Sequence, residues 1–172
     1  EFERTLTTPN SRFDKWLRGD DAAITAEELK GYNLFKEYNC ATCHVGPNLG
    51  GMSYELMGLR RHYFDARGTE LTEEDNGRYK ETKEERDRHR FKVPGLRNVE
   101  LTWPYYHDGT RATMDEAVRD MALYQCDVEL TDAETEAIVA FLRTLTGEHN
   151  GQLLTNHNEY GVILDHDEEH EH

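Results

Sequence analysis

The feature that most constrains this chain is a short segment with two cysteines and a histidine: Cys40, Cys43 and His44, in the order Cys-Ala-Thr-Cys-His. A structural zinc site would need two more ligands at suitable spacing, and the sequence has no second Cys-x-x-Cys pair. A thioredoxin-like redox pair belongs to a βαβ pattern, which is missing here. The histidine directly after Cys43 favours haem c, because both thiols can add to haem vinyl groups and the imidazole can then bind the iron.

Haem c is attached outside the cytoplasm, so the motif predicts a periplasmic or otherwise extracytoplasmic protein. The third cysteine, Cys126, is then either a small core residue or a thiol that is free to pair with another molecule.

Composition and charge narrow the classes of function. The chain of 172 residues has the size of one domain, and 32% of its residues are charged. It contains no run of about 18 apolar residues that could span a membrane. The formal net charge of −15 argues against nucleic acid as a partner and favours basic proteins instead. No signal peptide is visible after Glu1, so we expect a mature chain or a fragment.

Three predicted helices begin with a Thr-x-x-Glu capping box, in which each side chain binds a free amide of the first turn. The boxes are Thr25 with Glu28, Thr113 with Glu116, and Thr131 with Glu134. The first helix carries Gly31 and Phe35 four residues apart, where a glycine would let another helix cross closely. The final helix, with Phe141, is the expected partner, and Gly147 marks its expected end.

No alternating run of β-branched residues is present, so we expect an all-α fold: a cytochrome c-like haem domain with long loops and an irregular N-terminal arm. Residues 1–22 lack periodicity and are interpreted as an inter-domain arm or linker. Residues 23–147 are interpreted as the haem domain, and residues 148–172 as an acidic, His-rich C-terminal tail. Residues 72–92 carry opposite charges that cancel, which is typical of a solvated loop or an exposed helix.

The segment after the motif, Val-Gly-Pro-Asn-Leu-Gly-Gly at residues 45–51, must turn tightly around the haem edge. It resembles the Gly-Pro-Asn-Leu segment of small cytochromes c, here brought closer to the histidine. That resemblance implies that the carbonyl of Pro47 accepts a hydrogen bond from the second ring nitrogen of His44, which would fix the ring and raise the basicity of the ligand. A simple turn is the alternative interpretation.

The sixth ligand of the iron decides what the iron does, because an open position can bind peroxide whereas a methionine thioether favours electron transfer at a raised potential. The candidates are Met52, Met57, Met114, Met121, His62, His89 and His107. Met52 and Met57 are too near His44 in the sequence to cross easily to the other haem face. Met114 and Met121 are seven residues apart on one predicted helix, so both could point inward. The residues alone leave both open, together with a histidine ligand or an empty sixth position.

A longer resemblance bears on this choice. Residues 91–99 read Phe-Lys-Val-Pro-Gly-Leu-Arg-Asn-Val, residues 101–109 read Leu-Thr-Trp-Pro-Tyr-Tyr-His-Asp-Gly, and residues 112–118 read Ala-Thr-Met-Asp-Glu-Ala-Val, shortly before Met121. This succession resembles the second haem domain of bacterial di-haem cytochrome c peroxidases. Residues 2–20 resemble the inter-domain segment of that family, so the likeness extends from residue 2 to residue 147.

The resemblance implies a function. The family reduces hydrogen peroxide to water in the periplasm with electrons from small cytochromes c. Its first domain carries the peroxidatic haem, and its second carries a high-potential haem that relays electrons. Carried over to this chain, Cys40 and Cys43 tether the haem, His44 is the proximal ligand and Met121 is the sixth ligand. The position of Met114 is commonly Leu in the family, which makes Met114 a core residue.

The resemblance also implies further site residues. The family binds calcium between its domains, and Thr102 and Pro104 would be ligands through their backbone carbonyls, as suits a hard ion; a plain loop turn is the alternative. Arg97 or Lys92 is the candidate partner of a haem propionate, because the fork of an arginine suits a carboxylate. A surface salt bridge would explain these two residues equally well.

The main departure from the family is that the motif occurs once, so the peroxidatic haem domain is missing from this sequence. The leading hypothesis is an electron-entry domain that accepts electrons from a small basic cytochrome c and passes them to a peroxidatic haem domain outside this chain. The alternatives are a stand-alone monohaem electron carrier, a peroxidase in its own right with Met121 displaced, and a relative that oxidises another substrate. A homodimer is compatible with the sequence as well.

Overall fold

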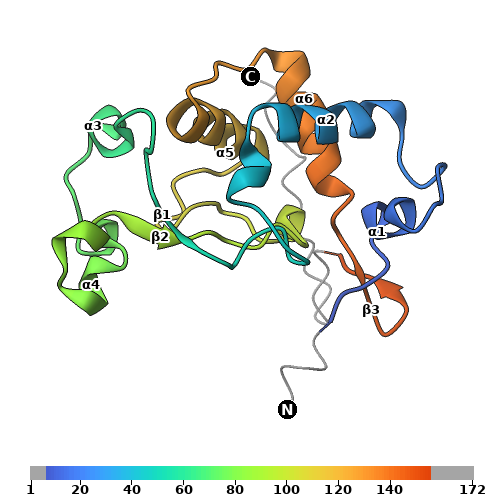
Figure 1. The fold of residues 1–172 in the computed structure, drawn as a ribbon, viewed down its shortest axis with the longest axis horizontal. Coiled ribbons are helices and arrows are strands. Elements are labelled where there is room, and N and C mark those ends of the chain that lie inside the picture. The colour runs from blue at the N-terminus through green and yellow to red at the C-terminus, as the bar shows by residue number, and fades with distance from the viewer. Residues whose placement is uncertain (1–6, 156–172) are drawn as a thin grey trace, which may run out of the picture.

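The computed structural model describes residues 7–155, and helices dominate it (Figure 1). Its α-helices are α1 (Arg12–Leu17), α2 (Ala26–Glu37), α3 (Tyr63–Arg67), α4 (Tyr79–Thr82), α5 (Met114–Asp120) and α6 (Asp132–Arg143). Short 3₁₀ turns are η2 (Cys40–Thr42), η3 (Glu74–Asn76), η4 (Glu85–Asp87) and η5 (Val99–Leu101), and α5 continues into a π-helical segment, η6 (Met121–Gln125). Within residues 7–155, no helix has the length and apolar character needed to cross a membrane.

Helices α2 and α6 pack against each other and form the centre of the fold. The three predicted capping boxes are all present, at the N-termini of α2, α5 and α6. Gly31 lies where α2 meets α6, and a Cβ atom at this position would stand 1.8 Å from the carbonyl oxygen of Ala137. The predicted close crossing of the first and final helices is therefore confirmed.

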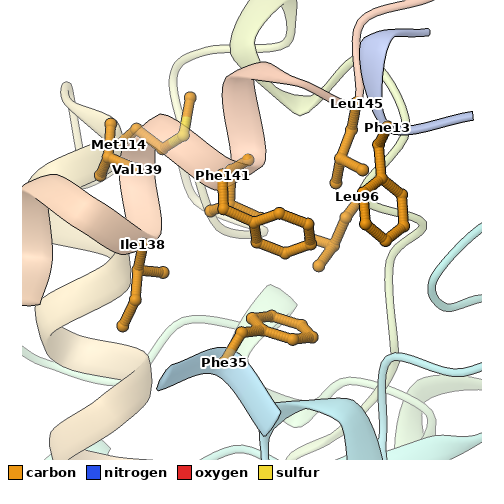
Figure 2. Close-up of a cluster of buried hydrophobic side chains, with 9 residues drawn as sticks. Phe13, Phe35, Leu96, Met114, Ile138, Val139, Phe141 and Leu145 are labelled. Atoms are coloured by element: carbon orange, nitrogen blue, oxygen red, sulfur yellow. The ribbon is translucent and has the colours of Figure 1, made fainter. Parts of the chain in front are cut away.

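The hydrophobic core surrounds the ring of Phe141, which is fully buried (Figure 2). This ring contacts the rings of Phe13 and Phe35, with centroids 5.2 and 5.4 Å away. The buried cluster comprises Phe13, Phe35, Leu96, Met114, Ile138, Val139, Phe141, Leu142 and Leu145. Met114 is thus a core residue, as the family resemblance implied.

The N-terminal segment is not the irregular arm that we expected, at least where the structure describes it. Residues 12–17 form α1, which begins with a capping box between Ser11 and Asp14. Phe13 inserts into the core, and the N–H of Phe13 donates to the carbonyl of Thr144 over 3.1 Å. A helix of six residues is too short to show a periodic apolar stripe in the sequence. Its anchor is one aromatic side chain, which leaves no recognisable pattern.

The fold also contains two small antiparallel ribbons, which the all-α expectation did not include. One pairs β1 (Tyr54–Leu56) with β2 (Arg90–Lys92), and the other pairs β3 (Glu148–His149) with β4 (Gln152–Leu153). Strands of two or three residues are too short to show alternation in the sequence. The second ribbon means that the predicted tail begins with ordered structure; its remaining part, from residue 156 on, lies outside the described residues.

Two other expectations need correction. Helix α6 ends at Arg143 and is capped by Thr144, so Gly147 does not terminate it. Residues 72–92 are not simply a solvated loop, because they contain η3, α4, η4 and β2 and bury Asp75 and Asp87. Nearby cations neutralise these carboxylates, which removes most of the cost of burying them.

Candidate haem site

The Cys-x-x-Cys-His segment follows directly from the end of α2. Asn39 adopts a left-handed conformation with φ of 63°, and this reverses the chain into the η2 turn. Within the turn, the N–H groups of Cys43 and His44 both donate to the carbonyl of Cys40, over 3.3 and 3.1 Å. Cys40 and Cys43 are not joined to each other by a disulfide. The turn therefore presents two free thiols and an imidazole from a single short segment, as covalent haem attachment requires.

The ring of His44 is held by the loop that follows it. Its Nδ1 lies 3.0 Å from the carbonyl oxygen of Leu49, and the backbone of Pro94 is a second hydrogen-bond partner of the ring. With Nδ1 held by Leu49, Nε2 is the nitrogen that would bind a metal. Burial lowers the pKa of His44, which favours the neutral imidazole that a metal binds. The ring of Phe35 packs beside the imidazole, with centroids 6.1 Å apart. The donor set and its orientation fit a c-type haem.

The predicted hydrogen bond from His44 to Pro47 does not form in this structure. The loop turns so tightly that Leu49 N–H donates to Gly46 and Gly50 N–H donates to Val45, over 3.0 and 2.9 Å. This turn brings the Leu49 carbonyl to the imidazole. The Pro47 carbonyl instead accepts a hydrogen bond of 2.6 Å from Nε of Arg97.

Glycine is needed at one position of this loop. Gly50 has φ of +143°, and a Cβ atom there would stand 2.0 Å from the carbonyl oxygen of Pro94. The segment around Pro94 therefore lies directly against the loop, and Leu96 N–H donates to the Asn48 carbonyl over 3.0 Å. The residues 93–97 brace the loop that orients His44.

Arg97 makes a salt bridge rather than presenting a free guanidinium for a haem propionate. Its Nη1 and Nη2 bind both carboxylate oxygens of Asp14, over 2.9 and 2.7 Å. These bonds hold the pKa of Asp14 below its usual range. With Nε donating to Pro47, the fork of Arg97 is committed to protein partners. For Arg97, the structure favours the salt-bridge interpretation. Lys92, the other candidate, is exposed on β2.

Four of the candidates for the sixth ligand lie in clearly different surroundings in the structure. Met114 is buried in the core, and Met52 is 72% exposed, with its side chain beside Gly46 of the loop that follows His44 (residues 45–51, the proximal loop). His89 and His107 each bind Asp75 through one ring nitrogen, over 2.6 Å to its carbonyl and 2.7 Å to its carboxylate. Burial in the core removes Met114 from the candidates, and Met52 lies on the same side as the loop that follows His44.

Met121 lies at the junction of α5 and the π-helical segment η6, and its side chain is partly buried. Its N–H donates to the carbonyls of both Ala117 and Val118, where the α-helical pattern gives way to the wider π pattern. Isolated π turns of this kind are frequent at functional sites, because they re-aim one side chain of a helix.

The sequence leaves two interpretations of Cys126, a small core residue or a thiol that is free to pair with another molecule. In the structure it follows η6 and lies against the Cys40 thiol, and this contact raises the pKa of Cys40. The end of η6 therefore meets the η2 turn. No local sequence signal could have revealed this proximity, because 86 residues separate the two cysteines.

The calcium candidates, Thr102 and Pro104, are exposed and lie just after η5. The Oγ1 of Thr102 donates to the Val99 carbonyl over 3.0 Å, which fixes the start of this loop. The role of their carbonyls as calcium ligands stays a prediction.

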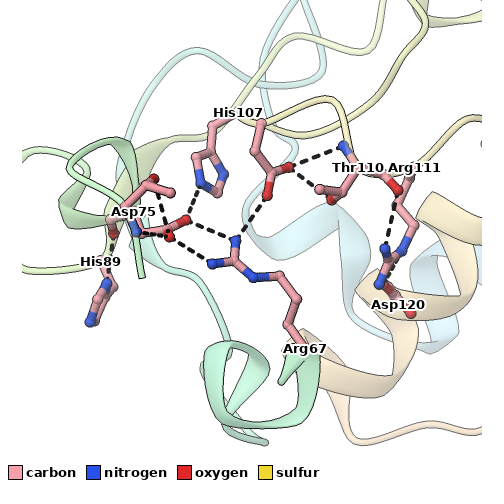
Figure 3. Close-up of polar contacts among 9 residues, drawn as sticks. Arg67, Asp75, His89, His107, Thr110, Arg111 and Asp120 are labelled. Atoms are coloured by element: carbon pink, nitrogen blue, oxygen red, sulfur yellow. Dashed lines mark hydrogen bonds and ion pairs between the residues drawn. The ribbon is translucent and has the colours of Figure 1, made fainter. Parts of the chain in front are cut away.

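A second polar cluster, centred on Asp75, was missed in the sequence (Figure 3). Asp75 is 1% exposed and binds Nη1 and Nη2 of Arg67 over 2.9 and 2.6 Å, while Arg67 also reaches Asp108 over 2.9 Å. Ligand atoms of Asp75, His107 and Asp108 lie within 4.8 Å of one another, as in a metal site. The guanidinium of Arg67 already supplies the cation between the two carboxylates, so the cluster is a structural ion-pair network.

Three proteins named as cytochrome c peroxidases are similar in sequence to this chain. Cytochrome c peroxidase Ccp of Escherichia coli (strain K12) is 55% identical over 147 residues, which make up 86% of this chain and 31% of that protein. The cytochrome c551 peroxidases of Nitrosomonas europaea and Pseudomonas aeruginosa are 50% and 42% identical, each covering 86% of this chain and 42% of the relative. This chain thus spans less than half the length of these relatives.

A crystal structure of a MauG-like protein associated with microbial copper homeostasis has the same fold, with a TM-score of 0.65 and 27% sequence identity. The match covers 81% of this chain and 49% of that chain. Residues 29–146, which include the η2 turn, His44 and Met121, match the family model described as Cytochrome c. The chain belongs to the cytochrome c family.

Proposed function

We propose that this chain is the electron-transferring haem c domain of a cytochrome c peroxidase. The observation that carries the proposal is the η2 turn, where two free thiols precede an imidazole whose Nδ1 is held by Leu49, so that Nε2 would be the nitrogen that binds iron. Haem c bound there would supply a one-electron iron centre. Identities of 55% and 50% to two cytochrome c peroxidases support this class of enzyme.

In this proposal, Cys40 and Cys43 tether the haem, His44 is the proximal ligand and Met121 is the sixth ligand. The burial of Met114 in the core and the π turn at Met121 support that choice. A sixth ligand that closes the iron to peroxide would make the domain an electron relay rather than the site of peroxide reduction.

The same proposal assigns partners. The donor is a small basic cytochrome c, because a net charge of −15 speeds encounters with a basic protein. Electrons would then pass to a peroxidatic haem domain outside this chain, and the carbonyls of Thr102 and Pro104 would supply oxygen ligands to a calcium ion between the two domains. The compartment is the periplasm, since haem c is attached outside the cytoplasm.

Optical spectra of the haem-loaded chain test the ligand assignment. We expect a low-spin spectrum, with the weak near-infrared band that reports a methionine–iron bond in the ferric protein. Met121→Leu should abolish this band and give a high-spin or differently ligated haem. Met114→Leu is the matched control, because it makes the same chemical change in the core and should leave the band in place. A band that survives Met121→Leu would contradict the assignment.

Peroxide turnover tests the relay role. The haem-loaded chain alone should reduce hydrogen peroxide slowly, and Met121→Leu should be faster because it opens the sixth position. Fast turnover by the unchanged chain, together with a high-spin ferric spectrum, would show instead that this domain is itself the peroxidase.

A further inference from the structure

The salt bridge of Arg97 connects two parts of the chain that are far apart in the sequence. The guanidinium binds Asp14 of α1 through Nη1 and Nη2, and it binds the Pro47 carbonyl of the proximal loop through Nε, over 2.6 Å. The side chains of Arg97 and Asp14 are only 23% and 12% exposed. A bidentate, shielded pair of this kind holds its geometry better than a surface ion pair does.

Asp14 is itself fixed to the body of the domain. Its carboxylate accepts the N–H of Ser11, and its own N–H donates to the Ser11 hydroxyl, both over 3.1 Å. Ser11 is fully buried, and the neighbouring Phe13 packs in the core. The anchoring end of the salt bridge is therefore a rigid point rather than a mobile side chain.

Arg97 contacts the proximal loop at Pro47, two residues before Leu49, whose carbonyl orients the proximal histidine. Pro47 is held by the Arg97 side chain, and Asn48 is held by the N–H of Leu96 over 3.0 Å. The next residue, Leu49, presents its carbonyl to Nδ1 of His44 over 3.0 Å. The position of that carbonyl thus depends on the hydrogen bonds within the loop and on two contacts from outside it, of which Arg97 supplies one.

Resting on the proposed function, we propose that the Arg97–Asp14 pair is a positioning clamp that sets the His44–Leu49 hydrogen bond and, through it, the reduction potential of the haem. A ring N–H that donates to a carbonyl makes the imidazole a more basic ligand, which favours ferric iron. Loosening the clamp weakens this hydrogen bond, and the potential should rise. Arg97 touches neither the histidine nor the iron, so it acts as a positioning residue.

The test must separate this effect from simple electrostatics. Removing Arg97 alone also deletes a positive charge near the iron, which lowers the potential and opposes the effect of a looser loop. The double variant Asp14→Asn/Arg97→Gln removes one charge of each sign, so its net charge is unchanged. Lys15→Gln/Glu148→Gln is the matched control, because it removes another ion pair of α1, with N···O of 3.0 Å, which does not touch the proximal loop.

Two readouts on the haem-loaded chain report the clamp: the reduction potential, and the rate at which the Nδ1 proton of His44 exchanges with solvent, followed by NMR of its shifted resonance. We expect the double variant to have a higher potential and faster exchange than the unchanged chain. The control pair should match the unchanged chain in both. Arg97→Lys keeps the charge but loses the planar fork. Its reduction potential and its exchange rate should therefore lie between those of the unchanged chain and those of the double variant.

The outcomes distinguish this proposal from the one on which it rests. An unchanged chain without a His-ligated low-spin haem would overturn both. A low-spin haem whose potential and proton exchange are the same in the double variant and in the control would overturn the clamp alone. If the double variant does not retain haem, Arg97→Lys is read by the same criterion, and an unshifted potential with unchanged exchange would again overturn the clamp.

Discussion

Two regions of this molecule differ in what they bury: one buries mainly apolar side chains, and the other buries charged ones. The helical half, formed by α1, α2, α5 and α6, surrounds an apolar cluster centred on Phe141. The charged lobe, residues 63–92 from α3 to β2, lies at the other side of the molecule (Figure 1) and is organised around Asp75 and Arg67. Both regions are ordered, although only the first has a conventional core.

This difference determines how the stability of each region responds to pH, to salt and to substitutions. In the helical half, burial of each large apolar side chain contributes about 1.5–3 kcal/mol, and the contribution changes little with pH or salt. In the charged lobe, desolvation of Arg67 and Asp75 offsets most of their mutual attraction, so the pair adds little net stability while it is intact. Breaking one partner, however, leaves an uncompensated buried charge. The lobe should therefore be the region that responds to charge and acid.

The largest effect should follow from separating α2 and α6. Gly31→Val places two methyl groups beyond a Cβ that would already stand 1.8 Å from the Ala137 carbonyl, so the helices must move apart. We expect a loss of more than about 4 kcal/mol in the free energy of unfolding, measured by denaturant titration of the haem-loaded chain. Lys30→Val, at an exposed position of the same helix, is the control for the helix propensity of valine. Similar losses in the two variants would show that the crossing is not the sensitive point.

The next largest loss in the free energy of unfolding should come from Asp75→Asn in the charged lobe. This change keeps the size of the side chain but leaves the guanidinium of Arg67, which is 7% exposed, without its main counter-charge. We expect a loss of about 3 kcal/mol, measured in the same titration. Asp127→Asn breaks the exposed pair with Arg61 and should cost little. An equally small loss for Asp75→Asn would mean that water or rearrangement compensates Arg67, and the distinction between the two regions would then weaken.

The pH dependence of stability should also distinguish the regions. The hydrogen bonds from Arg67 hold the pKa of Asp75 well below its ordinary value, against the opposing effect of burial. A carboxylate with a lowered pKa stabilises the fold fully above its ordinary pKa of about 3.9, and this stabilisation is lost as the pH falls below that value toward the lowered pKa. The stability difference between the unchanged chain and Asp75→Asn should therefore be constant from about pH 5 upward and should shrink below about pH 4. A difference that stays constant in acid would contradict the role of the Asp75 charge.

The same contrast explains what could be predicted from the sequence. The capping boxes of α2, α5 and α6 and the crossing at Gly31 follow local rules, so the residue types and their spacing were sufficient. Asp75 has no such signal, since its partners are chosen by the tertiary fold: His107 is 32 residues away. Nothing in the local pattern distinguishes it from the exposed Glu74 beside it.

The candidate site shows the same division. The motif of Cys40, Cys43 and His44 is local, and the sequence predicts its chemistry directly. The resemblance predicts that the carbonyl of Pro47 accepts the hydrogen bond from Nδ1 of His44, whereas the structure gives this role to Leu49, two residues further along. That assignment depends on how tightly the loop turns, and the turn is braced by Leu96 and Arg97 from a distant segment. Contacts of this kind are set by tertiary packing.

The smallest of these effects should come from a single helix cap, and it tests whether the helical half responds only locally. The Oγ1 of Thr131 accepts the N–H of Glu134 over 3.3 Å, and Thr131→Ala removes that bond while leaving the apolar face of α6 intact. We expect a loss of about 1 kcal/mol, seen as a shift of the denaturation midpoint with an unchanged slope. Thr131→Ser keeps the hydroxyl and should restore most of the loss. A loss as large as that of Asp75→Asn would show that the start of α6 supports more than its own first turn; the Tyr38 hydroxyl, which donates to Glu134 from the end of α2, would be the first contact to examine.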